Sequence, residues 1–324
     1  MKILIAGGAG YIGSALVPRL IDRGYYMDVV DLLWFGNHLP TGLNILKKNV
    51  FDLQQGDVEG YDQVIFLAGL SNDPMAEFSP SMNFNYNASA PAYLAYIAKM
   101  GGVKRFIYAG SCSVYGYTVN DLYDEQAPAI SKHPYGISKL QGEKAVVQLA
   151  DKGFSTICFR QGTVSGYSPR MRLDLIVNTM FKSAMEKGEI TVNNPSIWRP
   201  ILSMDDACNA YIRAIEASDE ISGIFNIASG NYTVGEAADI VRGAIEKKLS
   251  RSIKLTIKHI QDFRNYKVSI EHAMNVLSFK PKHDVESIVD NLIDNKECFK
   301  DYSNPNYYNI KVFESLKTEL VKTV

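Results

Sequence analysis

A glycine-rich loop near the N-terminus constrains the fold of this chain more than any other stretch. Residues 2–6 are a continuous apolar run, the pattern of a strand buried on both faces of a parallel sheet. Glycines follow at positions 7, 8, 10 and 13, and apolar residues at helical spacing continue to Leu20. These glycines match the patterns G-x-G-x-x-G and G-x-x-G-x-x-G, in which glycine allows a tight turn and lets the backbone come close to a pyrophosphate. The stretch predicts a dinucleotide site at a helix N-terminus, although a glycine-rich turn of another α/β protein also fits it.

An acidic residue follows at the distance expected for such a site. A second predicted strand, residues 27–31, ends at Asp31, which lies 18 residues after Gly13. A carboxylate at about this position accepts hydrogen bonds from the ribose hydroxyls of NAD. Residues 32–35 contain no arginine or lysine, so a 2′-phosphate would have no cationic partner there. The sequence therefore favours NAD over NADP.

Predicted strands and helices alternate over the first half of the chain. Apolar runs that are typical of buried strands cover residues 63–70, 103–109 and 154–159, and helical patterns cover residues 79–99 and 134–150. Such alternation predicts an α/β fold with a doubly wound parallel sheet.

The pattern loosens beyond these elements, which suggests a second structural unit. A chain of 324 residues is long enough for one large domain or for two. We predict a NAD-binding domain of residues 1–166, to which residues 199–229 return, and a smaller α/β substrate domain of residues 167–198 and 230–324.

Composition excludes several other classes of protein. The net charge of −1 gives no electrostatic reason to expect nucleic acid or a membrane surface as partner. The N-terminal apolar run is too short for a signal peptide or a membrane span. The four cysteines are widely spaced and the five histidines form no cluster, so we expect reduced thiols, a cytoplasmic location and no metal.

A tyrosine and a lysine stand four positions apart at a predicted helix start. Tyr135 and Lys139 would project from the same helical face. A neighbouring cation lowers the pKa of a phenol, which makes such a pair suitable as an acid/base near neutral pH. Taken alone, however, such a pair is more often a surface contact, because a Tyr and a Lys four positions apart occur by chance on many helices.

Three hydroxyl groups follow the predicted strand 103–109, within the stretch Ser111-Cys112-Ser113-Val114-Tyr115. Open α/β sheets bind their ligands at the carboxyl ends of their strands. These hydroxyls therefore predict part of a ligand site, with a polar loop that caps the strand as the alternative.

The glycine loop, Asp31, Ser111, Tyr135 and Lys139 together resemble the extended short-chain dehydrogenase/reductase superfamily. Within it, the chain resembles the NAD-dependent epimerase/dehydratase family, which acts on nucleotide sugars and has a Rossmann fold. The resemblance covers almost the whole chain and includes the residues 114–116, Arg160, Arg199 and the stretch 262–266.

The resemblance implies a catalytic role for three of these residues. Tyr135 would take the proton from a sugar hydroxyl while a hydride passes to NAD. Lys139 would lower the pKa of Tyr135 and hold the nicotinamide ribose. Ser111 would hydrogen-bond the same sugar hydroxyl.

The resemblance also implies two sets of binding residues. Asn85 would support the catalytic region, while Asp52 and Leu53 could border the adenine because they follow a third apolar stretch. Arg199 and Arg264 would clamp the diphosphate of the sugar nucleotide because a guanidinium pairs oxyanions bidentately; an ion pair elsewhere is the alternative for each. The expected cofactor contacts are Gly7, Gly10, Tyr11, Ile12, Gly13, Asp31, Asp52, Leu53, Leu67, Ala68, Gly69, Asn85, Tyr135 and Lys139. The expected substrate contacts are Ser111, Ser113, Thr163, Arg170, Arg172, Asn178, Arg199 and Arg264.

Departures from the family pattern limit which of the family's reactions we expect. The 4,6-dehydratases carry Asp and Glu after the active-site hydroxyl, where this chain has Cys112 and Ser113. Ser113 also replaces the glutamate of decarboxylating members, and Thr163 stands where many relatives have a substrate-binding asparagine. We therefore expect sugar-nucleotide 4-epimerisation, which needs only hydride transfer and one acid/base.

Three alternatives to epimerisation stay open. The first is net oxidation of the sugar at C4, or the reverse reduction of a keto sugar. The 4,6-dehydratase reaction is disfavoured by the missing carboxylates, and a non-catalytic NAD-binding protein is disfavoured by the intact catalytic set. The helices 79–99 and 134–150 are apolar on more than one side. The resemblance implies that such helices form a dimer interface, so we expect a homodimer unless those residues belong to the core.

Overall fold

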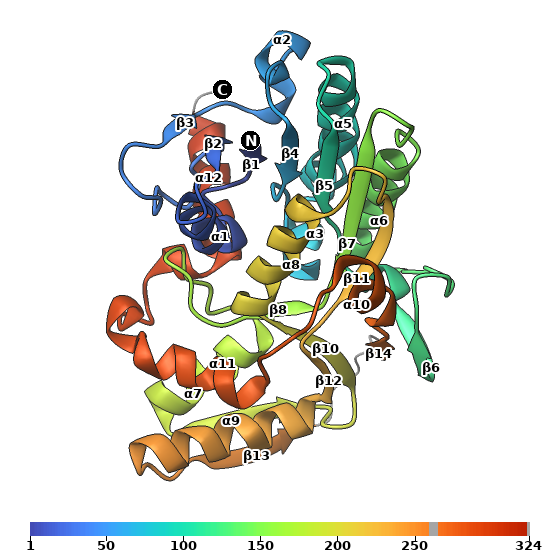
Figure 1. Ribbon diagram of the computed structural model, residues 1–324. Coiled ribbons are helices and arrows are strands. Elements are labelled where there is room, and N and C mark those ends of the chain that lie inside the picture. Colours follow the sequence, from blue (N-terminus) through green and yellow to red (C-terminus); the bar gives the residue numbers. More distant parts are fainter. Residues whose placement is uncertain (259–264, 323–324) are drawn as a thin grey trace.

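A seven-stranded parallel sheet forms the centre of the molecule (Figure 1). The computed structural model describes residues 1–258 and 265–322. The strand order is β3-β2-β1-β4-β5-β7-β11, and every neighbouring pair is parallel. The strands are β1 (Lys2–Ala6), β2 (Tyr26–Val30), β3 (Asn44–Leu46), β4 (Gln63–Phe66), β5 (Arg105–Ala109), β7 (Ser155–Gln161) and β11 (Gly223–Ile227). The direction of strand progression reverses between β1 and β4, where doubly wound sheets bind their ligands.

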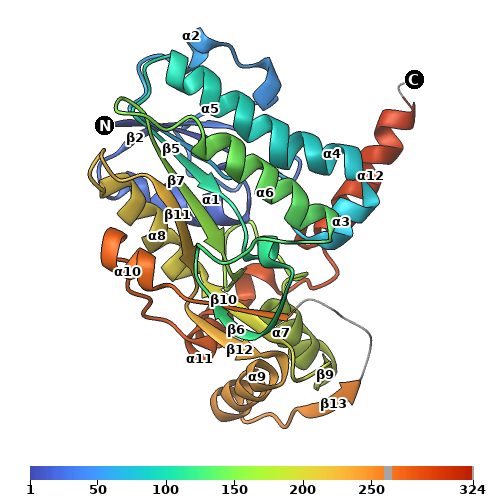
Figure 2. The same ribbon diagram turned by 90° about the vertical axis from the view of Figure 1, so that its right-hand side faces the viewer.

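Helices cover both faces of this sheet, which confirms the predicted doubly wound α/β fold (Figure 2). One face packs against α1 (Tyr11–Ile21) and α8 (Met204–Glu216), and the other against α5 (Ala90–Met100) and α6 (Pro134–Val147). The side chains of β1 alternate between the two faces, since Ile3 lies in the core cluster of the first face and Leu4 in that of the second.

The predicted helix 79–99 is interrupted. It consists of α4 (Pro80–Phe84), a π-helical turn η2 (Asn85–Ser89) and α5. Pro91 has no N–H to donate to the carbonyl of Asn87 four residues earlier, and this carbonyl instead accepts from the Tyr108 hydroxyl at 3.0 Å. A proline near the start of the second segment therefore marks the irregularity.

Four short elements pack against the helices of the second face. The turn η1 (Val50–Asp52) and the helix α2 (Gln55–Val58) contact α5, whereas α3 (Asp73–Phe78) and η3 (Cys112–Tyr115) contact α6. The strands β6 (Tyr117–Tyr123) and β14 (Asn265–Val268) pair in parallel as a separate two-stranded sheet.

The remainder of the chain lies below the carboxyl ends of the large sheet in Figure 1. A three-stranded sheet contains β8 (Thr163–Ser165), β10 (Trp198–Ser203) and β12 (Gly230–Thr233), and β9 (Glu189–Asn193) pairs with β13 (Lys254–Lys258). The helices are α7 (Ile176–Lys187), α9 (Val234–Leu249), α10 (Glu271–Leu277), α11 (Val285–Asp294) and α12 (Asn309–Lys322), with the 3-10 turns η4 (Lys296–Phe299) and η5 (Pro305–Tyr307).

Residues 199–229, which we expected to return to the NAD-binding domain, divide between the two parts. β11 joins the edge of the large sheet, whereas β10 lies in the three-stranded sheet. The domain boundaries stay a prediction. Over the residues that the structure describes, no helix is long and apolar enough to cross a membrane.

The C-terminal helix α12 returns from the lower part to the large sheet, beside α3 (Figures 1 and 2). Its Phe313 is buried against Trp34 and Phe35, which follow β2. Residues far apart in the sequence therefore meet next to the glycine loop.

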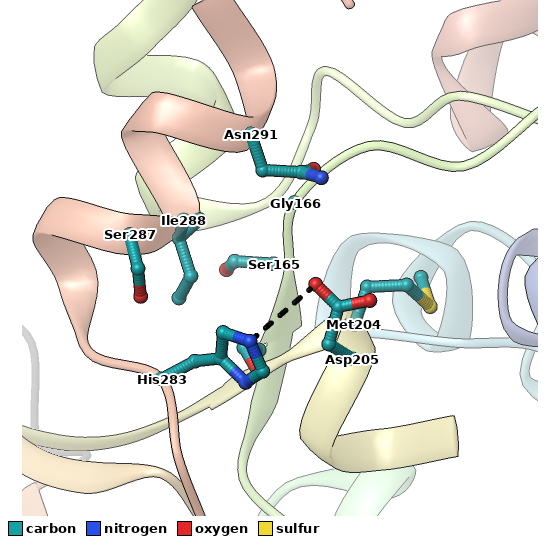
Figure 3. Close-up of a pocket in the computed structure, with 9 residues that line it drawn as sticks. Ser165, Gly166, Met204, Asp205, His283, Ser287, Ile288 and Asn291 are labelled. Carbon is teal, nitrogen blue, oxygen red and sulfur yellow. Dashed lines mark ion pairs between the residues drawn. The ribbon is translucent and has the colours of Figure 1, made fainter. Parts of the chain in front are cut away.

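A contact between α8 and the segment before α11 holds the lower part to the large sheet (Figure 3). The His283 ring lies 3.0 Å from an Asp206 carboxylate oxygen and 3.9 Å from one of Asp205. Asp205 in turn pairs with Arg19 of α1. The hollow around these residues leaves no room for a water-sized ligand, so we interpret it as a structural joint.

Candidate active site

A cavity of about 550 Å³ opens at the carboxyl ends of β1, β4, β5 and β7, between the large sheet and the lower part of the molecule. Its volume lies in the range typical of small-molecule and cofactor sites. It brings together sixteen of the predicted site residues, namely Gly7, Gly10, Tyr11, Ile12, Gly13, Leu67, Ala68, Gly69, Ser111, Ser113, Tyr135, Lys139, Thr163, Arg170, Arg172 and Arg199. Arg264 lies outside the described residues.

The glycine loop has the geometry of a phosphate cradle. Gly7 has a φ of +79°, and a Cβ atom there would lie 2.4 Å from the backbone nitrogen of Ala68. A Cβ atom on Gly13 would lie 2.3 Å from the carbonyl oxygen of Gly8. No side chain caps the first turn of α1, which begins after Gly10, so its N–H groups are available to an anion.

Asp31 supports this loop from the end of β2. Its two carboxylate oxygens accept from the backbone N–H groups of Ala9, at 3.0 Å, and Leu33, at 2.8 Å. Burial raises the pKa of Asp31. The side chain does not line the cavity, and its contact with a ribose stays a prediction.

Asp52, Leu53 and Asn178 also lie outside the cavity lining. Asp52 is exposed and caps the turn η1, whereas Leu53 is a core residue whose carbonyl accepts from Tyr93. Asn178 is buried and donates to the Tyr11 hydroxyl, at 2.9 Å, and to the carbonyl of Arg172, at 2.7 Å. It therefore positions two cavity-lining residues without lining the cavity itself.

Ser111, Tyr135 and Lys139 converge at the other end of the cavity. Ser111 follows β5, and both Tyr135 and Lys139 lie on α6. The Ser111 hydroxyl hydrogen-bonds the phenol of Tyr135. The Lys139 ammonium donates to the carbonyl of Ala109 at 2.9 Å and lies over the Tyr108 ring, 5.3 Å from its centroid.

Burial sets the pKa values of this pair. It raises the pKa of Tyr135 to about 12, although the hydrogen bond from Ser111 and the charge of Arg172 act to lower it. Burial also lowers the pKa of Lys139 to about 7. We expected Lys139 to lower the pKa of Tyr135, but a lysine desolvated to this extent loses its charge near neutral pH. The cation that lowers the Tyr135 pKa in this structure is Arg172.

Buried asparagines fix the catalytic helix. Asn83 donates to the carbonyl of Pro134 at 3.0 Å, and Asn87 donates to the side chains of Asn83, at 2.8 Å, and Ser138, at 3.3 Å. Asn85 is exposed and does not line the cavity. The contacts that we expected from Asn85 are therefore made by the asparagines two positions before and after it.

A buried ion pair joins the catalytic helix to the sheet. The guanidinium of Arg160, on β7, donates to both carboxylate oxygens of Glu143, on α6, at 2.8 and 2.7 Å. Arg160 also donates to the Tyr115 hydroxyl at 2.9 Å. Removal of either charge would leave the other buried and unpaired, so the pair specifies where α6 lies.

The expected substrate end contains residues that sequence reasoning missed. Tyr266 lines the cavity, and its hydroxyl lies 3.4 Å from that of Ser113, while Arg199 lies over its ring. Asp73 also lines the cavity, and its charge acts to raise the pKa of Tyr135. The preceding Asn72 has a φ of +101°, a strained value of the kind found at functional sites. No sequence motif marked Asp73.

Comparisons with known proteins agree with this geometry. The sequence profile of the NAD dependent epimerase/dehydratase family matches residues 3–228. UDP-glucose 4-epimerase of Halalkalibacterium halodurans is 25% identical over 332 residues, which cover 94% of this chain and 99% of that protein. UDP-glucose 4-epimerase 2 of Arabidopsis thaliana is 25% identical over 328 residues, covering 89% and 92%.

Solved structures share the fold. MoeE5 in complex with UDP-glucuronic acid and NAD superimposes with a TM-score of 0.80 at 21% identity, covering 92% of this chain and 99% of that one. UDP-N-acetylglucosamine 4-epimerase from Methanobrevibacter ruminantium M1 has a TM-score of 0.79 at 21% identity, covering 91% and 98%. Together with the family profile, these findings show that the chain is an NAD-dependent enzyme and belongs to the NAD-dependent epimerase/dehydratase family.

Proposed function

We propose that this enzyme is a nucleotide-sugar 4-epimerase. The observation that carries the proposal is the shared cavity, which has a phosphate cradle for NAD at one end and Ser111, Tyr135 and Lys139 at the other. An acid/base placed beside a hydride acceptor is sufficient to oxidise a sugar hydroxyl and to reduce the resulting ketone.

The residues of this cavity fit NAD. The glycine loop admits no Cβ at Gly7 or Gly13, and the uncapped first turn of α1 would hold the pyrophosphate. Asp31 would accept from the adenosine ribose, and Lys139 would hold the nicotinamide ribose. Bound at these residues, NAD would supply the hydride-transfer chemistry that the oxidation and reduction of the sugar C4 require.

Tyr135 is the proposed acid/base. It removes the proton of the C4 hydroxyl during oxidation and returns it to the C4 oxygen during reduction. Ser111, which hydrogen-bonds the phenol, holds the sugar oxygen beside it. Lys139 has a pKa of about 7 and can therefore gain or lose a proton near neutral pH, which suits it to exchange protons with the site.

The proposed substrate is a nucleoside-diphosphate sugar. Arg199 lines the cavity beside Tyr266 and provides a guanidinium for the diphosphate, and the predicted role of Arg264 is the same. Both relatives described above are UDP-glucose 4-epimerases, which supports a UDP sugar as the first substrate to test.

Residues 112 and 113 argue against elimination of water. Cys112 is buried and its thiol donates to the carbonyl of Arg160 at 3.1 Å, while Ser113 contacts Tyr266. Neither side chain carries a carboxylate that could serve as the acid or the base of an elimination. Net oxidation of C4, or the reverse reduction, uses the same three residues and is the second candidate.

A panel of sugar nucleotides separates these functions. The purified enzyme is incubated with UDP-, GDP-, CDP- and dTDP-sugars, the products are identified by NMR, and reduced cofactor is followed by its absorbance. The proposal expects inversion at C4 without net formation of NADH. Stoichiometric NADH would favour the dehydrogenase, and a Tyr135→Phe variant with unchanged turnover would favour a protein that does not use this catalytic set.

We also propose a homodimer and a cytoplasmic location. Tyr96 and Met100 lie one helical turn apart on α5 and are 54% and 53% exposed, which supports an interface on the face of α5 and α6. All four cysteines are free, three of them buried, which supports a reducing compartment. Light scattering tests the dimer, and a monomeric mass would contradict it.

A further inference from the structure

The segment before α7 is attached to the phosphate-binding turn of α1. Ser168 donates to the carbonyl of Tyr11 at 2.7 Å, and its hydroxyl lies 2.8 Å from that of Ser14. The backbone N–H of Arg170 donates to the same Ser14 hydroxyl at 3.1 Å. Arg170 therefore stands at the glycine-loop end of the cavity, although we predicted it as a substrate contact.

Arg170 is a buried cation held by neutral groups. Its side chain is 2% exposed, one terminal nitrogen donates to the side-chain oxygen of Asn309 at 2.5 Å, and its Nε has no hydrogen-bond partner. The guanidinium lies 3.8 Å from the centroid of the Phe35 ring. Among the side chains that the structure describes, no carboxylate forms an ion pair with Arg170, although the charges of Asp174 and Asp31 act on it.

The neighbouring Arg172 differs in this respect. Its Nε donates to Asp174 at 2.8 Å and one terminal nitrogen donates to Ser71 at 2.9 Å. Asp174 therefore pairs directly with Arg172, whereas Asp174 and Asp31 act on the charge of Arg170 without an ion pair to it.

A desolvated cation without a counter-charge is costly, and an anion offsets this cost. Burial lowers the pKa of Arg170 to about 9 and the charge of Arg172 adds to the effect, whereas the charges of Asp174 and Asp31 offset it only in part. The anion that belongs at the first turn of α1 is the pyrophosphate of a dinucleotide.

The C-terminal helix α12 holds Arg170 from the outside. Asn309, its first residue, is 5% exposed; it accepts from Arg170 and donates to Ser71 at 2.9 Å. One turn further on, the Phe313 ring packs edge-on against Trp34, with ring centroids 5.0 Å apart, and its centroid lies 6.3 Å from that of Phe35. The ring that supports Arg170 is thus itself supported by α12, which lies over this end of the molecule (Figure 1).

We propose that Arg170 binds the pyrophosphate of NAD and that α12, through Asn309 and Phe313, forms part of the cofactor site. The inference rests on NAD as the cofactor and is independent of the sugar reaction. A substrate diphosphate is chemically similar, so the experiment must separate the two anions.

Calorimetric titration of the cofactor-free protein with NAD, and separately with UDP, makes this distinction. Arg170→Met should weaken NAD binding about 10- to 100-fold, the value of one charge-assisted hydrogen bond, and should leave UDP binding unchanged. The affinity of Arg170→Lys for NAD should lie between that of the parent protein and that of Arg170→Met. The matched control, Arg199→Met, should weaken UDP binding and leave NAD binding unchanged.

Asn309→Asp tests the role of α12 with Arg170 in place. The new carboxylate keeps the hydrogen bond but neutralises the guanidinium, so NAD binding should weaken as in Arg170→Met. This variant also decides the matter if Arg170→Met does not fold. Unchanged NAD binding in Asn309→Asp, or weakened UDP binding with unchanged NAD binding in Arg170→Met, would overturn the proposal.

Discussion

The buried lysine of the catalytic set should make stability depend on pH in a way that one substitution removes. Lys139 is 5% exposed, and burial lowers its pKa from an ordinary 10.5 to about 7. Lys139→Met keeps the length of the side chain and removes the titrating group. In the parent protein, folding must either bury the Lys139 ammonium or remove its proton, and both cost free energy. The variant avoids this cost and should therefore be more stable than the parent protein at neutral pH.

The sign and the pH window follow from linkage. Between about pH 7 and 10.5 the unfolded chain binds a proton at Lys139 that the folded protein does not, so the free energy of unfolding rises with pH. At about 1.4 kcal/mol per pH unit, the burial cost is about 4 kcal/mol at pH 7 and about 2 kcal/mol at pH 9. Lys139→Met also loses the hydrogen bond to the Ala109 carbonyl, which costs about 1 kcal/mol of stability at either pH and reduces the expected gain by that amount.

Denaturant unfolding of the cofactor-free parent and variant measures this difference. The variant should gain about 3 kcal/mol at pH 7 and about 1 kcal/mol at pH 9. Lys144→Met, an exposed position on the same helix, controls for the general effect of replacing a lysine. A variant that is less stable than the parent at pH 7, or a difference that does not change with pH, would refute the reasoning.

Three further substitutions test the cradle, the base and its electrostatics. Gly13→Ala places a Cβ atom 2.3 Å from a backbone oxygen and should weaken NAD binding at least about tenfold by calorimetry, while Gly243→Ala, whose Cβ meets nothing, should bind NAD normally. Tyr135→Phe should lower turnover about 10²- to 10⁴-fold with NAD binding retained, and a smaller loss would argue against Tyr135 as the base. Asp73 raises the pKa of Tyr135, so Asp73→Asn should move the acidic limb of the kcat/KM profile to lower pH; an unmoved limb would contradict that contact.

Local features of the site could be predicted from the sequence. The glycine loop joins β1 directly to α1, so its geometry depends on neighbouring residues, and Tyr135 and Lys139 lie on one turn of a helix. Ser111 follows a strand whose neighbours in the sheet could be inferred from the alternation of elements. In each case short-range sequence determines the position.

Long-range packing determines the rest. Asn83 and Asn87, rather than Asn85, contact the catalytic helix, and Asn87 lies in a π-helical turn that the sequence pattern did not predict. Asn309 and Asp73 reach the cavity only through the folding of distant segments. The pKa values of Tyr135 and Lys139 depend on burial, which their spacing does not reveal.

The fate of the hydrogen at C4 tests the proposed reaction most directly. A UDP sugar that carries deuterium at C4 is incubated with the enzyme, and the product is examined by NMR and mass spectrometry. If one hydride leaves C4 and returns to the opposite face, the product has inverted configuration and deuterium still at C4. Deuterium found in released reduced cofactor, or at C6 of the sugar, would contradict the account.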